Sequence, residues 1–296
     1  MRIRPAAVAL IGSLVAGLPA AGQAVRTGFL DRVVAMDGHD YPYQVYVPSA
    51  YEATESWPVI LFLHGAGERG SDGLLQTAVG LAPAIRRDAA RYPAIVVFPQ
   101  SPRDSLWTGT PAQAAMAALE RTMEEFSVDP DRVYLTGLSM GGHGTWYLAY
   151  RHPERFAAVV PICAWVRPRP DVPRASSVVP PEDGEPFEVL ARRLRDVPIW
   201  IFHGEVDRVV PVEESREAAA ALEAAGADVR YTELLGVDHD SWDAAYGSPE
   251  LTTWLFAQRR GSRNPSGAWG WADADLRSLR SLRVRAQPSS LVVDDT

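Results

Sequence analysis

The chain has 296 residues, of which 29 are basic and 37 acidic, giving a net charge of -8, and 47% of its residues are hydrophobic. The acidic balance argues against nucleic-acid binding, and this length is enough for one large core. All 29 basic residues are arginines, which excludes chemistry that needs a lysine: Schiff-base, pyridoxal, Ser-Lys and P-loop catalysis.

The N-terminal segment has the pattern of an export signal. Arg2 and Arg4 precede an apolar stretch over residues 6–18, and small residues follow up to Ala24. The apolar stretch is too short to span a bilayer, and no cysteine follows it to carry a lipid. We therefore expect residues 1–24 to be a signal peptide cleaved after Ala24, with the mature protein secreted or periplasmic.

Strand and helix patterns alternate over residues 25–260, which we expect to form one catalytic domain. The expected strands cover residues 29–35, 41–47, 59–63, 94–98, 132–136, 156–161, 197–202 and 229–234, and the expected helices cover residues 112–126, 140–151 and 212–225. The helix over 112–126 is expected to be capped by Thr110. This order predicts an α/β fold: a mostly parallel sheet with helices on both faces and an antiparallel N-terminal hairpin. Cys163, the single cysteine, is expected to be a buried small hydrophobe.

The apolar run over 59–63 ends in the loop His64-Gly65-Ala66-Gly67-Glu68-Arg69-Gly70. Small residues at such a place let backbone N–H groups approach a carbonyl oxygen closely. The sequence therefore predicts an oxyanion hole formed by the N–H of Ala66 with that of Met140. A tight strand-to-helix turn without that role is the alternative.

The segment Gly137-Leu138-Ser139-Met140-Gly141 follows the strand over 132–136 and precedes the helix over 140–151. A serine between glycines at such a junction is typical of a nucleophile elbow, in which a sharp turn exposes the hydroxyl. Only residues as small as glycine allow the neighbouring turns to close around it. Ser139 is the predicted nucleophile.

A serine hydroxyl needs an imidazole to take its proton and a carboxylate to orient that imidazole. Asp207 follows the strand over 197–202 and is predicted to be the acid in preference to Glu205, which lies too close to the strand end. His239 follows the next strand, and of the six histidines only this one comes after that acid, so it is the predicted base. Asp238 and Asp240 flank it and are expected to be solvated or capping charges.

These motifs, together with Pro99-Gln100-Ser101-Pro102 and His239-Asp240-Ser241-Trp242, resemble the secreted esterase or predicted-peptidase branch of the α/β-hydrolase superfamily. The resemblance covers about residues 41–260 and lies near dienelactone hydrolases and feruloyl or polyhydroxybutyrate-type esterases. It implies the α/β-hydrolase fold and a triad of Ser139, Asp207 and His239. Dienelactone hydrolases carry a cysteine at the elbow, so the serine here argues against a lactone-type substrate.

Other segments are less informative. Tryptophans at or after strand ends are candidates for a substrate pocket: Trp107, Trp165 and Trp242. The proline-rich stretch over 166–186 is expected either to wall the cleft or to be a surface insertion. Residues 261–296 are expected to be a tail, disordered or loosely docked, in which the spacing of Leu276, Leu279 and Leu282 also allows a short amphipathic helix.

The predicted function is hydrolysis of carboxylic esters through an acyl-enzyme intermediate, on a small-molecule or polymer-linked substrate. Peptide or amide cleavage by the same residues is the alternative, and a non-catalytic binding protein on a hydrolase scaffold is a further one. The sequence predicts no cofactor and no metal, because no cluster of ligands has metal spacing. It leaves the oligomeric state open.

Overall fold

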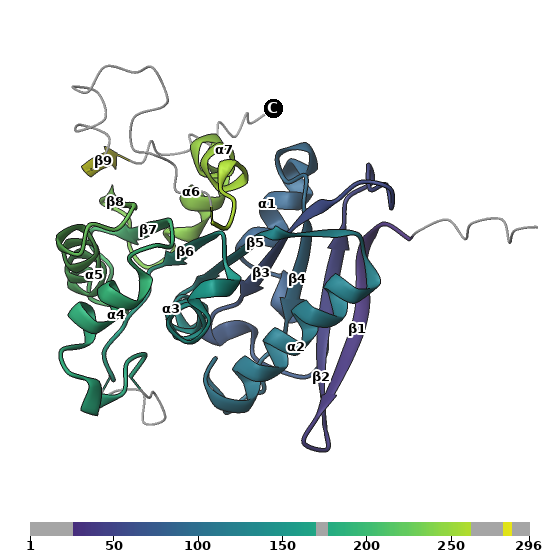
Figure 1. The fold of residues 1–296 in the computed structure, drawn as a ribbon, viewed down its shortest axis with the longest axis horizontal. Coiled ribbons are helices and arrows are strands. Elements are labelled where there is room, and N and C mark those ends of the chain that lie inside the picture. The colour runs from purple at the N-terminus through teal and green to yellow at the C-terminus, as the bar shows by residue number, and fades with distance from the viewer. Residues whose placement is uncertain (1–25, 170–176, 262–280, 286–296) are drawn as a thin grey trace, which may run out of the picture.

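The structure is a computed structural model that describes residues 26–169, 177–261 and 281–285 (Figure 1). Its strands are β1 (Gly28–Met36), β2 (His39–Val47), β3 (Trp57–Leu63), β4 (Ile95–Pro99), β5 (Val128–Leu138), β6 (Ala158–Ile162), β7 (Ile199–Gly204), β8 (Val229–Leu235) and β9 (Ser281–Arg285). Its α-helices are α1 (Leu81–Arg87), α2 (Gly109–Glu125), α3 (Met140–Arg151), α4 (Pro186–Leu194), α5 (Glu213–Ala224), α6 (Trp242–Gly247) and α7 (Pro249–Ala257). Two 3₁₀ turns, η1 (Ala66–Glu68) and η2 (Leu75–Thr77), follow β3.

The nine strands of the described residues form one sheet in the order β1-β2-β4-β3-β5-β6-β7-β8-β9. β2 pairs antiparallel with β1 and with β4, and every pairing from β4 through β3 to β9 is parallel. The predicted α/β-hydrolase architecture with an antiparallel N-terminal hairpin is confirmed. Because β3 and β5 to β8 are parallel, their carboxyl ends lie along one edge of the sheet.

Helices cover both faces of the sheet, with α2 to α5 on one side and α1, α6 and α7 on the other (Figure 1). The central strand β3 shows why its sequence is apolar without alternation. Val59, Leu61 and Leu63 pack toward the first group of helices, and Ile60 and Phe62 toward the second. A strand buried on both faces must be apolar at every position.

The hairpin of β1 and β2 turns at two residues, Asp37 and Gly38, whose φ angles are 52° and 77°. Met36 pairs with His39 directly across this turn. A two-residue turn with positive φ at both positions matches the right-handed twist of the strands, and Asp-Gly is among the sequences that favour it. The strands are therefore longer than the ranges expected from the sequence.

Several details differ from the expectations, and helices α1, α4, α6 and α7 were not among the expected helices. Helix α2 begins at Gly109 with Thr108 at the N-cap, so Thr110 lies inside the helix and is not its cap. In the tail, residues 281–285 form β9, parallel to β8. Leu282 and Val284 alternate with arginines, a period of two that favours a strand over the short helix that the leucine spacing also allowed.

The predicted signal peptide, residues 170–176 of the proline-rich stretch and most of the tail lie outside the described residues. Among the helices that are described, none combines the length and the apolar character required to cross a membrane.

Candidate active site

Ser139 lies at the turn between β5 and α3 with φ 53° and ψ -117°. A side chain at positive φ is strained, and the strain persists because the surrounding backbone leaves no alternative. A β-carbon built on Gly141 would lie 1.9 Å from the carbonyl oxygen of Leu63, and one built on Gly137 would lie 2.4 Å from the carbonyl oxygen of Gly141. The two glycines are thus required by backbone-to-backbone contact, as expected of an elbow.

The loop after β3 lies directly against this elbow. His64 is buried, its Nδ1 lies 2.6 Å from the carbonyl oxygen of Gly65, and its Nε2 lies 3.0 Å from the backbone nitrogen of Ser101. Since the Ser101 N–H must donate, Nε2 accepts and Nδ1 carries the proton. Burial lowers the pKa of His64 to about 4, so this neutral form persists near neutral pH.

The bond from His64 orients the peptide that joins Gly65 to Ala66. In a trans peptide the N–H points opposite to the C=O, so the Ala66 N–H points away from His64. Ala66 is exposed and begins η1, while Met140 is the first residue of α3. The first N–H groups of a helix have no partner within it, so both predicted oxyanion donors are free of intrahelical bonds.

Asp207 lies in the loop after β7 and its side chain is buried. Its Oδ1 accepts the backbone N–H groups of Val209 at 2.8 Å and Val210 at 2.9 Å. Its Oδ2 lies 2.8 Å from His239 Nδ1 and 3.1 Å from His203 Nε2. Burial alone would raise the pKa of Asp207, but these donors, led by His203 and His239, outweigh it and hold the pKa well below its usual range.

His239, in the loop after β8, joins the other two predicted residues. Its Nε2 lies 2.8 Å from Ser139 Oγ, and its Nδ1 lies 2.8 Å from Asp207 Oδ2. The carboxylate accepts, so Nδ1 carries the proton and Nε2 is free to receive one from the serine. The imidazole is 19% exposed, whereas the carboxylate behind it is inaccessible. The structure therefore brings Ser139, His239 and Asp207 together from three strand ends.

The other carboxylates near His239 are engaged elsewhere. Asp238 Oδ2 pairs with Arg208, whose Nε lies 2.6 Å away, and Asp238 Oδ1 accepts the backbone N–H groups of Arg208 and His239. Glu205 accepts the backbone N–H of Gly236 at 2.9 Å. Asp240 is exposed. Of these four acids, only Asp207 forms a hydrogen bond with a ring nitrogen of His239.

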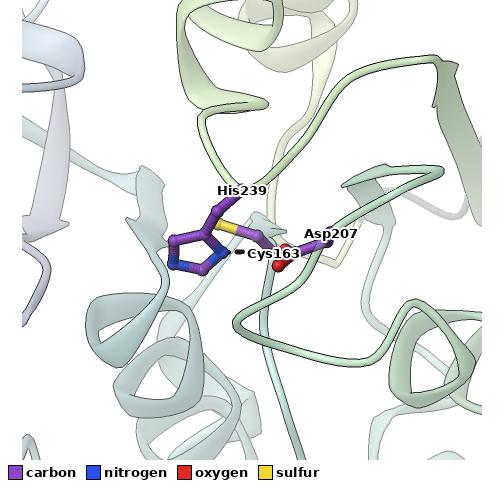
Figure 2. A group of neighbouring side chains, drawn as sticks. All are labelled: Cys163, Asp207 and His239. Atoms are coloured by element: carbon purple, nitrogen blue, oxygen red, sulfur yellow. Dashed lines mark hydrogen bonds and ion pairs between the residues drawn. The ribbon is translucent and has the colours of Figure 1, made fainter.

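Cys163, directly after β6, lies beside Asp207 and His239, and their potential ligand atoms fall within 4.8 Å of one another (Figure 2). This grouping was not expected from the sequence. A metal would need a thiolate and a free imidazole nitrogen. Burial raises the pKa of the Cys163 thiol, and Nδ1 of His239 already donates to Asp207. The donor set does not fit a metal, and the predicted burial of Cys163 is confirmed.

The three tryptophans occupy different environments. Trp107 is fully buried, donates from Nε1 to the His64 carbonyl oxygen at 3.0 Å, and packs where Gly144 has no side chain. Trp165 is buried and stacks on His143 at 4.7 Å. Both are packing residues rather than parts of an open pocket. Trp242 is partly exposed, and its ring lies edge-on to His239 at 5.6 Å, so it remains a candidate for contact with substrate.

The proline-rich stretch is attached to α5 at its beginning. Glu214 accepts the backbone N–H groups of Val166 at 2.8 Å and Arg167 at 3.3 Å, and the Arg167 side chain pairs with Glu217. Farther along, the Val178 N–H donates to the Val166 carbonyl oxygen at 3.3 Å. These contacts join Val166 and Arg167 to α5, and Val178 to Val166.

A sequence model of the family described as "Putative esterase" matches residues 34–254. The chain belongs to this esterase family. Among curated proteins it is 28% identical over 222 residues to "Putative esterase NocK" of Nocardia uniformis, covering 68% of this chain and 62% of that protein. It is 27% identical over 199 residues to an uncharacterized secreted protein of Arthroderma benhamiae, covering 62% of this chain but only 21% of that protein.

Solved structures share the fold of this chain. A thermostable esterase is 34% identical, with a TM-score of 0.67, and the match covers 78% of this chain and 63% of that one. The S-formylglutathione hydrolase FrmB of Staphylococcus aureus is 16% identical with a TM-score of 0.60, covers 78% of this chain and shares the fold. This chain therefore spans less than two thirds of the length of the thermostable esterase and of both curated relatives.

Proposed function

We propose that this member of the esterase family is an exported serine hydrolase that cleaves carboxylic esters through an acyl-enzyme. One observation carries the proposal: a single imidazole, His239, lies 2.8 Å from both the Ser139 hydroxyl and the Asp207 carboxylate. The three residues are in hydrogen-bond reach in the order that nucleophilic catalysis needs. Ser139 is the nucleophile, His239 the general base and then acid, and Asp207 the residue that orients it.

In the first half-reaction Ser139 Oγ attacks the ester carbonyl carbon while its proton passes to His239 Nε2. The carbonyl oxygen becomes an oxyanion, which the N–H groups of Ala66 and Met140 stabilise. Collapse of this intermediate breaks the bond to the alcohol oxygen, which leaves with the proton from His239. Water then attacks the acyl-enzyme by the same steps, releasing the acid and restoring the serine.

Two features of the described residues suit this chemistry. The helix α3 directs its N-terminus at the reacting oxygen, which favours negative charge there. The buried Asp207 stays ionised because its pKa is held low, and an ionised acid stabilises the imidazolium that forms in each step. Removal of one oxyanion donor from such a site typically costs about 3 kcal/mol.

Export is part of the proposal and is supported by the basic and apolar pattern of residues 1–24 and by similarity to a secreted protein. We propose esters rather than peptides as substrates, because the family and the 34% identical structural relative are both described as esterases. The same three side chains could cleave an amide, so turnover of a panel of acyl and aryl esters beside prolyl peptides tests the preference. Faster cleavage of the peptides would reverse it.

The central test is Ser139→Ala, with Ser127→Ala, directly before the same strand β5, as its matched control. Loss of the nucleophile should lower kcat by roughly 10⁴-fold or more with the circular-dichroism spectrum unchanged. A fluorophosphonate probe should label the wild type and Ser127→Ala but not Ser139→Ala. If Ser139→Ala retained a tenth of the activity, the assignment of Ser139 as the nucleophile would be contradicted. Absence of labelling in the wild type would favour a non-catalytic binding protein.

A further inference from the structure

A second histidine lies behind the acid. His203, near the end of β7, is completely buried, and its Nε2 lies 3.1 Å from Asp207 Oδ2 and 3.1 Å from the carbonyl oxygen of Val210. Its Nδ1 lies 2.7 Å from the hydroxyl oxygen of Ser215, a buried residue of α5. Both ring nitrogens therefore have polar partners, and none of these partners is solvent.

These partners decide where the proton lies. A carboxylate oxygen and a carbonyl oxygen can only accept, so Nε2 of His203 must carry a proton that it shares between Asp207 and Val210. The Ser215 hydroxyl can either donate to Nδ1 or accept from it, so this contact does not compete with the proton on Nε2. His203 and His239 thus meet the same oxygen of Asp207 with opposite nitrogens, His203 through Nε2 and His239 through Nδ1.

Resting on the proposed function of the triad, we infer that His203 is a positioning residue for the reaction, and that its Nε2–H fixes the Asp207 carboxylate in the orientation that receives His239. The two oxygens of Asp207 then have two donors each, the amides of Val209 and Val210 on one and the two imidazoles on the other. A carboxylate bound from both ends cannot rotate about its terminal bond without breaking bonds in a buried site, which is costly.

The consequence for catalysis follows from the geometry of the imidazole. The orientation of the His239 ring depends on the hydrogen bond from Nδ1 to Asp207, because the other ring nitrogen must face the serine and then the leaving group. Any freedom of the carboxylate is passed to the imidazole, and misplacement of a base by a fraction of an ångström lowers the rate of proton transfer. His203 never contacts the reacting atoms and acts only through Asp207.

The two amide substitutions of His203 separate its bonds. The amide nitrogen of glutamine reaches about the position of Nε2, and the amide of asparagine occupies about the position of Nδ1. His203→Gln should keep a donor to Asp207, and His203→Asn should keep a partner for Ser215 but withdraw the donor. Both variants place a neutral amide in the same buried site, so each is the control for the other.

The measurement is kcat and KM on an ester substrate, normalised to active sites titrated with the fluorophosphonate probe. We expect His203→Asn to lose about 10- to 100-fold in kcat with KM changed by less than about twofold, and His203→Gln to stay within about threefold of the wild type. If His203 had a purely structural role, kcat would fall equally in the two variants, or its loss would follow the loss in melting temperature. Full kcat in folded His203→Asn, or equal loss in folded His203→Gln, would overturn the inference.

A second measurement is independent of activity and of the folding of any variant. The ¹⁵N chemical shifts of His203 in the wild-type protein report which ring nitrogen is protonated. The inference requires a proton on Nε2, and an unprotonated Nε2 overturns it. Failure of the triad itself would be seen instead as activity in Ser139→Ala, which leaves these shifts in place.

Discussion

The two sides of the candidate site are built differently. On the serine side, between β3 and β5, the backbone segments touch, and Gly137 and Gly141 leave no room for even one added carbon. On the acid and histidine side, after β7 and β8, the geometry rests on side chains: Asp207 is bound by two imidazoles and two amides, and Asp238 joins the two loops through Arg208.

This difference predicts how each side fails. Backbone segments in direct contact leave no space, so a side chain added at Gly137 or Gly141 should disturb folding. A network of side-chain hydrogen bonds can lose one member and remain folded, so a substitution on the acid side should lower the rate with a smaller effect on stability. The following predictions test this separation.

After the loss of Ser139 itself, the largest effect is expected on the acid side. Asp207→Asn replaces an acceptor by an amide that can bind the wrong tautomer of His239, and should lower kcat by about 10³ to 10⁴, equivalent to roughly 4 to 5.5 kcal/mol of transition-state stabilisation. Asp238→Asn and Asp240→Asn should lose less than about tenfold, because neither carboxylate faces the imidazole nitrogen. Steady-state kinetics on one ester compares the three variants. A greater loss of kcat in Asp238→Asn than in Asp207→Asn would identify Asp238 as the acid instead.

The next effect concerns the serine side. Gly141→Ala forces a β-carbon against the Leu63 carbonyl and should lower the free energy of unfolding by about 3 kcal/mol or more. Gly247→Ala is the matched control, because nothing lies within 4 Å of a β-carbon there, and should change the free energy by less than about 1 kcal/mol. Urea denaturation measures both. A Gly141→Ala protein as stable as Gly247→Ala would contradict the account of the elbow.

The smallest effect is a pH dependence of stability. The pKa of Asp207 is lower in the folded protein than in the unfolded chain, so the ionised group stabilises the fold above about pH 4, and this contribution is lost as the pH falls toward the folded-state pKa. The wild type should therefore lose, between about pH 5 and pH 2, on the order of 1 kcal/mol more stability than Asp207→Asn. If the free energies of unfolding of the two proteins changed equally with pH across this range, the low pKa of Asp207 would be contradicted.

Much of the site was predictable because parallel strands deliver their carboxyl ends to one edge of the sheet. A glycine-flanked serine after one strand, an aspartate after another and a histidine after the next must then lie near one another. The structure brings these three side chains within hydrogen-bond reach, and the alternation of strands and helices predicted the sheet that does so.

Other partners could not be predicted. Nothing in the spacing of His203 and Ser215 indicates that they meet, since β7 and α5 are brought together only by packing on one face of the sheet. Cys163 comes beside Asp207 because β6 and β7 are neighbours, an adjacency that the sequence order alone does not guarantee. Trp107 was a candidate for a substrate pocket, but it is buried and packs against Gly144, which has no side chain.

The sequence by itself indicated most of the strands and which residues with catalytic chemistry follow them, because periodicity, glycines and polar residues after buried runs are local properties of the chain. Only the tertiary structure decided which nitrogen of each histidine faces which oxygen, which tryptophan is buried and which loops are joined by Asp238. These properties depend on the packing of segments far apart in the sequence, where a difference of about 1 Å separates a hydrogen bond from no bond.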